Sequence, residues 1–228
     1  MRDRCRRAPA KLTLSLRVMG RRDDGYHLID AEMTTLELAD ELRFSAGGND
    51  LPPDDLVSRA LVAVGHAAGV RVEVDKHIPV GAGLGGGSAD AAAVLRWAGC
   101  ADLELAAGLG ADVAFCLVGG RARVGGIGEV VEPLPMVDTT FTLLTPPFPV
   151  WTPLVYRAWD DMGGPSGESG NDLEPAALRV EPRLVRWRDR LGDATGLTPR
   201  LAGSGGTWFV EGSHPEVDGA VVTRTGRP

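Results

Sequence analysis

The sequence predicts an α+β protein built from two domains. Residues 10–16 alternate between apolar and polar side chains, as a half-buried strand does, whereas residues 56–68 have the spacing of an amphipathic helix. The composition changes at residues 133–138, after a first run of strands and helices. We therefore expect a first domain at residues 1–137 and a second at residues 138–228.

The first strand, at residues 10–16, has two distinct faces. Its buried face should carry Leu12, Leu14 and Leu16, and Lys11 and Thr13 should share the other face. The remaining elements of the first domain follow in order. We expect a polar turn at 21–27, strands at 36–44 and 70–74, helices at 56–68, 88–97 and 103–110, a buried strand or helix at 113–118, and a strand-like stretch at 121–131.

The second domain should open with a strand at residues 139–144. Four prolines then predict a loop at 146–153, and a stretch rich in Gly and Ser predicts another at 162–170. Residues 178–191 have helical spacing with Trp187 in the apolar stripe, and residues 203–210 read as a glycine turn that enters a strand.

Composition excludes several classes of protein. The net charge of −7 argues against a nucleic-acid partner, because binding the phosphate backbone requires a basic surface. No apolar run reaches the ~20 residues of a membrane span, and no signal peptide is visible, so we expect a cytoplasmic protein without a membrane partner. The 3 cysteines lack the spacing of a zinc site or a disulfide framework.

The most informative segment is a glycine loop at residues 78–93 that runs directly into an alanine-rich helix start. Glycines allow backbone N–H groups to converge, and a helix N-terminus attracts an anion. The loop is not a Walker A loop, because Ser88 follows Gly87 without a lysine. The acidic partner of a dinucleotide-binding fold and the downstream segments of a protein kinase are also missing.

The remaining pattern, P-x-G-x-G-L-G followed by small residues, resembles the superfamily of galactokinase, homoserine kinase, mevalonate kinase and phosphomevalonate kinase (GHMP kinases). A purely structural glycine turn is the alternative. The resemblance implies that the loop binds ATP through Pro79, Gly81, Gly83, Leu84, Gly85, Gly86, Gly87, Ser88 and Ala89. Ser88 is expected at the helix N-cap, and the resemblance adds a Mg²⁺ contact for its hydroxyl.

Further segments narrow the resemblance to one family. They resemble segments of the 4-diphosphocytidyl-2-C-methyl-D-erythritol kinases. These segments are residues 8–14 (A-P-A-K-L-T-L), 22–27 (R-D-D-G-Y-H), 109–115 (L-G-A-D-V-A-F), 171–175 (N-D-L-E-P) and 202–207 (A-G-S-G-G-T). The resemblance implies a ribosomal S5 domain 2-like N-terminal domain and a ferredoxin-like C-terminal domain. It also implies ATP-dependent phosphorylation of the 2-hydroxyl of a cytidine diphosphate-linked polyol in the non-mevalonate isoprenoid pathway. We expect a monomer or a homodimer.

Phosphoryl transfer to an alcohol needs a base for the hydroxyl proton and a cation near the γ-phosphate. The resemblance assigns Asp112 as the general base and Lys11 as the cation that orients it. Taken alone, Asp112 could cap a helix and Lys11 could be a solvated strand residue.

The resemblance also implies how the substrate binds. Two aromatic rings, Tyr26 and Tyr156, would sandwich the cytosine while His27 meets its polar edge. Taken alone, Tyr156 is as compatible with a core position. Further contacts are expected from Thr13, Gly203, Ser204 and Gly205, and the other histidines, His66, His77 and His214, are expected to be surface residues.

Two alternatives stay open. The chain could be another GHMP small-molecule kinase, of the homoserine or mevalonate type. It could also be a non-catalytic nucleotide-binding paralogue, because Thr13 replaces the asparagine usual in the family and the stretch from residue 96 to 111 is short.

Overall fold

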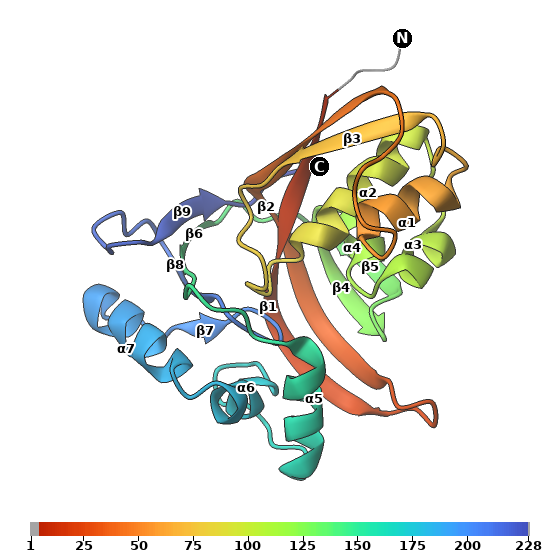
Figure 1. Cartoon of the computed structure of the whole chain (residues 1–228). Helices are drawn as coiled ribbons and strands as arrows, with labels where there is room; N and C mark the ends of the chain where they lie inside the picture. Colours follow the sequence, from red (N-terminus) through yellow and green to blue (C-terminus); the bar gives the residue numbers. More distant parts are fainter. Residues whose placement is uncertain (1–4, 228) are drawn as a thin grey trace.

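The structure is a computed structural model that describes residues 5–227 and contains two antiparallel sheets (Figure 1). In the first, five-stranded sheet the order is β1-β2-β4-β5, and β3 pairs with β2; in the second, four-stranded sheet it is β7-β8-β6-β9. The strands are β1 (Cys5–Arg21), β2 (His27–Ala46), β3 (Val70–Asp75), β4 (Arg121–Gly126), β5 (Val130–Leu134), β6 (Thr140–Leu144), β7 (Arg200–Leu201), β8 (Trp208–Glu211) and β9 (Val221–Arg224).

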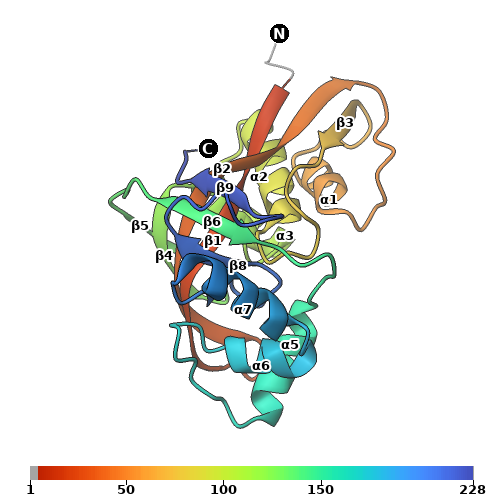
Figure 2. The same cartoon turned by 90° about the vertical axis from the view of Figure 1, so that its left-hand side faces the viewer.

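Helices pack on both sheets, and Figure 2 shows the same arrangement from the side. The helices are α1 (Leu56–Ala63), α2 (Gly86–Ala98), α3 (Leu103–Leu109), α4 (Val113–Val118), α5 (Thr152–Asp161), α6 (Glu174–Val180) and α7 (Leu184–Thr195). Helices α1 to α4 form one group beside the first sheet, while α5 to α7 belong to the C-terminal half (Figure 1). The α+β fold class is therefore confirmed.

Strands β1 and β2 form a long hairpin that runs through both halves of the molecule (Figure 1). The pairing slips at three places, between Pro9 and Lys11, between Thr13 and Ser15, and between Val18 and Gly20. A bulge changes which side chains face the core and so interrupts the alternation of apolar and polar residues. A prediction from simple alternation therefore made both strands too short. As a result Leu14 is only partly buried, and the expected limits of 10–16 and 36–44 were too short.

Helix α2 lies close to β1 because its inner face is made of alanine. Ala89, Ala91, Ala92 and Ala93 are completely buried. Small side chains allow a helix backbone to approach a sheet closely. This close packing places the start of α2, and the glycine loop before it, directly beside Lys11 on β1.

Two helix predictions were wrong in extent. The helix expected at 56–68 ends at Ala63, and Gly65 follows in a left-handed conformation at φ 75°. The helix expected at 178–191 is two helices, because Pro182 forces Glu181 into an extended conformation at φ −133°. Trp187 lies on α7 and packs partly buried against the core, as expected.

The prolines at 146–153 also misled the prediction. The loop ends at Trp151, and α5 begins at Thr152 with Pro153 in its first turn, where a missing N–H costs nothing. The ambiguous stretch at 113–118 is a helix, and 121–131 contains most of a strand pair joined by a turn. The segment at 162–170 is a loop, as expected, and the Trp159 indole donates to the carbonyl of Pro165 within it.

Candidate active site

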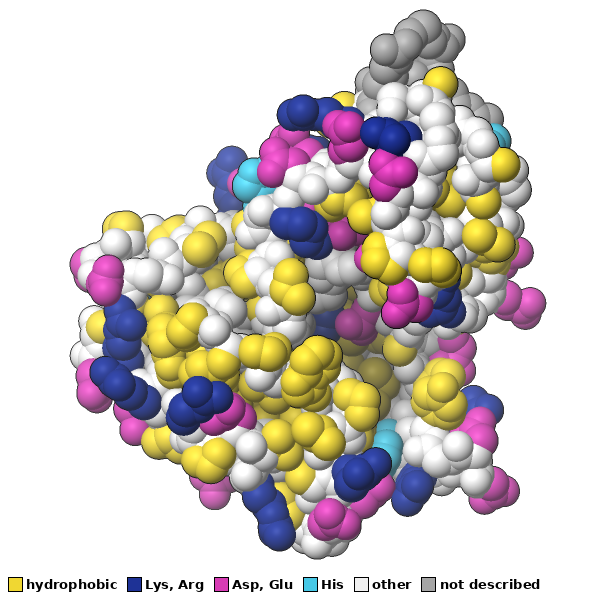
Figure 3. Space-filling model, in the orientation of Figure 1, with side chains coloured by type: hydrophobic (Ala, Val, Ile, Leu, Met, Phe, Trp, Pro, Cys, Tyr) yellow, Lys and Arg dark blue, Asp and Glu magenta, His cyan; other side chains and the backbone are white. Residues whose placement is uncertain are grey.

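Two cavities meet between the two halves of the molecule, where Figure 3 shows the surface hollowed. The glycine-loop cavity, of about 890 Å³, is lined by residues 79–88 together with parts of α1 and β3. The His27 cavity, of about 720 Å³, is lined by the lower end of the β1–β2 hairpin and by α5. Both cavities are lined by Lys11, Ser88, Asp112, Thr152 and Ser204.

The glycine loop is held by its carbonyl groups. The carbonyl of Leu84 accepts from the N–H of Lys11 at 3.0 Å, and that of Ala82 accepts from Thr207 at 3.0 Å. The first N–H groups of α2 have no intrahelical acceptor, as at any helix start. The loop thus offers N–H donors at the mouth of the glycine-loop cavity, which is the arrangement that binds phosphate.

The prediction that Ser88 caps α2 was wrong. The N-cap is Gly85, at φ 69°, and Ser88 is the third residue of the helix. Only glycine readily adopts this left-handed conformation, and a Cβ at Gly85 would lie 2.7 Å from Cγ of Lys11. Because Ser88 makes no capping bond, its hydroxyl is left to contact a ligand in either cavity.

Lys11 and Asp112 form an ion pair at the junction of the cavities. The Nζ of Lys11 lies 3.3 Å from Oδ2 of Asp112 and donates to Oγ1 of Thr13 at 3.0 Å. The Lys11 side chain is 7% exposed and that of Asp112 is 32% exposed. Lys11 is therefore not a solvated strand residue, and the Asp112 carboxylate stays accessible to a ligand.

Asp112 is positioned by the start of α4. It occupies the N-cap of that helix, but its side chain makes no capping bond. The turn before it is buttressed by Gly128, where a Cβ would lie 2.5 Å from the carbonyl oxygen of Ala111. Behind it, burial and then the charge of Asp112 raise the pKa of the Cys116 thiol to about 12, so this cysteine stays protonated and takes no nucleophilic role.

The turn at residues 203–205 faces Lys11 across the junction. A Cβ on Gly203 would lie 3.3 Å from Oγ1 of Thr13 and 3.4 Å from Nζ of Lys11. Buried Asn171 supports the turn by donating to the carbonyls of Leu201 and Gly203 at 2.9 and 2.7 Å. The N-D-L-E-P segment therefore has a structural role that its sequence did not reveal.

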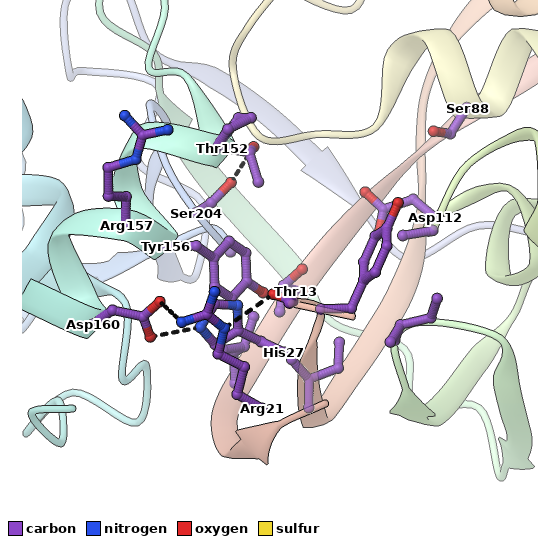
Figure 4. Close-up of a pocket in the computed structure, with 18 of the residues that line it drawn as sticks. Thr13, Arg21, His27, Ser88, Asp112, Thr152, Tyr156, Arg157, Asp160 and Ser204 are labelled. Carbon is purple, nitrogen blue, oxygen red and sulfur yellow. Dashed lines mark hydrogen bonds and ion pairs between the residues drawn. The ribbon is translucent and has the colours of Figure 1, made fainter. Parts of the chain in front are cut away.

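The expected aromatic residues, Tyr26, His27 and Tyr156, all line the His27 cavity, and Figure 4 labels His27 and Tyr156. The His27 ring stacks on Tyr156 with centroids 4.7 Å apart, and Tyr26 is 61% exposed at the same cavity. Burial, with a smaller contribution from Asp112, raises the pKa of the Tyr156 phenol, which stays protonated. Tyr156 is packed against the core, yet it also lines the cavity.

Most of the predicted site residues line one cavity or the other. Ala89 does not, because it is completely buried under the loop, and Gly205 instead lies behind Gly83 with its carbonyl against it. Of the other histidines, His66 packs edge-on against Trp97, while His214 pairs with Glu216 at the surface.

Several residues of the site were missed from the sequence. Asp160 and Arg21 contact each other in the His27 cavity, and Thr152 shares a 2.6 Å hydrogen bond with Ser204 across the junction (Figure 4). Arg157 also lines the His27 cavity. The signal that could have found Asp160 is its spacing of four residues from Tyr156, which places both on one face of α5.

A charged cluster beside the glycine loop was also missed. Asp40 is completely buried and accepts from the N–H groups of His77 and Ile78 at 2.6 and 2.7 Å and from the Lys76 ammonium. Lys76 also donates to Oδ2 of Asp90 at 2.8 Å. The other oxygen of Asp90, Oδ1, is buried without a hydrogen-bond partner among residues 5–227.

Burial raises the pKa of Asp90 to about 6, and the neighbouring Asp40 adds to this, although Lys76 opposes it. The folded protein therefore binds a proton on Asp90 at a pH where the unfolded chain, with an Asp pKa of about 3.9, does not. The ionised carboxylate destabilises the fold above about pH 6, and the destabilisation disappears as the pH falls from about 6 to about 4.

We expect Asp90→Asn to remove this pH dependence. The free energy of unfolding of the native protein, minus that of the variant, should rise by an amount of the order of 1 to 3 kcal/mol as the pH falls from 7 to 4.5. Urea denaturation at several pH values measures it. The exposed Asp75→Asn, which removes one carboxylate from the end of β3, is the matched control for the change of charge. Parallel curves for the native protein and Asp90→Asn would contradict the expectation.

Among the described residues no group of three or more His, Cys, Asp or Glu is placed to hold a metal ion. A site with few protein ligands can still hold Mg²⁺, because this ion is commonly bound by one or two protein oxygens together with substrate phosphates. Ser88 and Asp112 supply such oxygens where the two cavities meet.

Within residues 5–227 there is no helix with the length and apolar character needed to cross a membrane.

Residues 55–120 match the family model described as the N-terminal domain of GHMP kinases. Together with the fold and the glycine-loop cavity, this match defines the class: an ATP-dependent small-molecule kinase of the GHMP type. Solved homoserine kinase from Cytophaga hutchinsonii (19% identity, TM-score 0.58, covering 100% of this chain and 96% of that one) shares the fold.

Closer relatives identify the family. The chain is 38% identical to 4-diphosphocytidyl-2-C-methyl-D-erythritol kinase of Granulibacter bethesdensis, over 92% of this chain and 85% of the relative. It is 39% identical to the same kinase of Pelotomaculum thermopropionicum, over 89% and 86%. A crystal structure of 4-(cytidine 5'-diphospho)-2C-methyl-D-erythritol kinase has 33% identity and a TM-score of 0.79, covering 97% of this chain and 99% of that one. The chain belongs to the 4-diphosphocytidyl-2-C-methyl-D-erythritol kinase family.

Proposed function

We propose that the chain transfers the γ-phosphoryl group of ATP to the 2-hydroxyl of 4-diphosphocytidyl-2-C-methyl-D-erythritol. One observation carries the proposal: Lys11, Asp112 and Ser88 line both cavities, so they lie where a group would pass from one cavity to the other. The glycine-loop cavity has the N–H donors that suit a triphosphate, and the His27 cavity has the aromatic rings that suit a pyrimidine.

In the proposed reaction the substrate hydroxyl gives its proton to the Asp112 carboxylate, and its oxygen attacks the γ-phosphorus. The bond from that phosphorus to the β,γ-bridging oxygen breaks, and ADP leaves. Lys11, 3.3 Å from Asp112, orients the carboxylate and stabilises charge on the transferred group. Mg²⁺, held near Ser88 and Asp112 by the phosphates, would neutralise part of the phosphate charge.

The proposed function also assigns a role to each domain. We infer that residues 1–137 form the ATP-binding domain and residues 138–228 the second domain, because the chain passes from the first sheet to the second between β5 and β6. Tyr26 and His27 would bind the cytosine from the hairpin and Tyr156 from α5. A cytoplasmic location and a monomeric or homodimeric state stay predictions from the sequence.

ADP release by the purified protein tests the function. We expect turnover with ATP, Mg²⁺ and 4-diphosphocytidyl-2-C-methyl-D-erythritol, and none with homoserine or mevalonate. Turnover of either of those alcohols instead would indicate another GHMP kinase, of the homoserine or mevalonate type. Saturable ATP binding without turnover of any substrate would indicate the non-catalytic alternative, and would contradict the proposal.

A further inference from the structure

Asp160 lines the His27 cavity from α5, although no sequence motif pointed to it. Its Oδ1 lies 2.7 Å from Nε2 of His27, and its Oδ2 lies 3.3 Å from Nη1 of Arg21 (Figure 4). The two carboxylate oxygens therefore have different partners. Its side chain is 29% exposed, whereas that of His27 is only 9% exposed, so the contact with the imidazole is largely shielded from water.

The His27 ring is held from three directions. It stacks on Tyr156 with an interplanar angle of 27°, contacts the edge of Trp159 at 90°, and hydrogen-bonds to Asp160 through Nε2. These contacts favour the ring orientation in which Nε2 lies toward Asp160. Within residues 5–227, no hydrogen bond to Nδ1 of His27 accompanies the one at Nε2.

The chemistry of the pair then fixes the tautomer of His27. A carboxylate only accepts hydrogen bonds, so Nε2 must carry the proton, and in a neutral imidazole the other nitrogen is an acceptor. When the imidazole is neutral, Nδ1 of His27 is thus an acceptor. A base that meets this nitrogen must donate a hydrogen bond to it. Cytosine has an exocyclic amine that donates at position 4, whereas uracil has a carbonyl oxygen there that only accepts.

We propose that Asp160 is a specificity-determining positioning residue, which sets the His27 tautomer and thereby selects a cytosine over a uracil nucleotide. The inference rests on the proposed function, since it concerns the base of the same substrate. Asp160 acts through His27 and does not itself touch the reacting atoms. A mismatched base would leave two acceptors facing each other in a shielded site, which costs far more than a lost contact in water.

Arg21 makes the test sharper, because a guanidinium only donates. In Asp160→Asn the amide oxygen should turn toward Arg21, which leaves the amide NH₂ facing His27. Nε2 must then accept, the proton moves to Nδ1, and Nδ1 becomes a donor. The variant should therefore lose its preference for cytosine. In Arg21→Met/Asp160→Asn the amide can turn either way, so part of the preference should return.

The experiment compares kcat/KM for 4-diphosphocytidyl-2-C-methyl-D-erythritol and its uridine analogue. In Asp160→Asn the ratio should fall by about 10- to 100-fold, mainly through KM for the cytidine substrate. Asp193→Asn is the matched control: it removes one charge from an exposed position of α7, lines neither of the two cavities, and makes no hydrogen bond or ion pair within residues 5–227. Its ratio should stay that of the native protein. An unchanged ratio in Asp160→Asn would overturn the inference.

A second readout needs no turnover. Nitrogen-15 NMR of the free protein, with the His27 signals assigned by their loss in His27→Gln, should show a protonated Nε2 and an unprotonated Nδ1. In Asp160→Asn the two should exchange. A native ring protonated at Nδ1, or at both nitrogens, would overturn the inference even if the enzyme is active. If the native protein turns over neither nucleotide, the proposed function has failed, and the NMR result still decides whether Asp160 sets the tautomer.

Discussion

In Asp112→Asn, kcat is expected to fall by about 10² to 10⁴-fold, because an amide cannot take the proton of the substrate hydroxyl. Affinity for ATP in the absence of Mg²⁺ should change little, since the glycine loop is held by backbone hydrogen bonds that do not involve Asp112. Single-turnover phosphoryl transfer and equilibrium ATP binding measure the two quantities separately.

The control for this variant is Asp102→Asn. Asp102 caps α3 by accepting from the N–H groups of Glu104 and Leu105, and asparagine caps a helix as well as aspartate does, so activity should be retained. In Lys11→Met/Asp112→Asn the two losses should not add, because the residues act as an ion pair. Native kcat in Asp112→Asn would rule out Asp112 as the general base.

Gly83→Ala is expected to weaken both the fold and ATP binding. Gly83 has a φ of 78°, and a Cβ there would lie 2.6 Å from the carbonyl oxygen of Ala202 and closer still to that of Gly205. The glycine loop and the turn at 203–205 would have to separate. We expect a loss of about 2 kcal/mol or more in the free energy of unfolding, from backbone strain and the clash together, and at least about a tenfold loss of ATP affinity.

Urea denaturation and calorimetric titration with ATP measure these effects. Gly108→Ala is the control, because Gly108 lies within α3 with open space around it, and alanine is the better helix former. Its stability should be equal or higher. If Gly83→Ala keeps native stability, the close approach of the two segments is not what holds the glycine loop.

The glycine-loop part of the site could be predicted from the sequence, because its residues lie in short, contiguous segments. The glycine loop, Lys11 and Asp112 each lie in such a segment, and the structure brings them to one junction. Their catalytic and binding roles stay predictions. The fold class could also be predicted, because the motifs resemble those of the GHMP kinases and the strand alternation and helical spacing of most elements are compatible with that fold.

What could not be predicted depends on tertiary geometry. Four prolines concealed the start of α5, so Asp160 was not placed on a helix one turn from Tyr156. The N-cap of α2 was assigned to Ser88 by residue preference, whereas the left-handed conformation of Gly85 sets the start of the helix. Lys76, Asp40 and Asp90 come from three separate segments, and no local pattern shows that they meet.

Backbone hydrogen bonds also join the two halves of the molecule. Ala82 accepts from Thr207 in the C-terminal half, and Gly226, near the end of the described chain, donates to Thr35 on β2. Each half therefore supplies backbone partners that the other half needs. A buried polar group without a partner lowers the stability of the fold. Unfolding of one half would therefore leave backbone groups of the other half without hydrogen-bond partners and would destabilise it. The two halves should behave as one cooperative folding unit, in which stability is gained in the same step as the assembly of the junction between the two cavities.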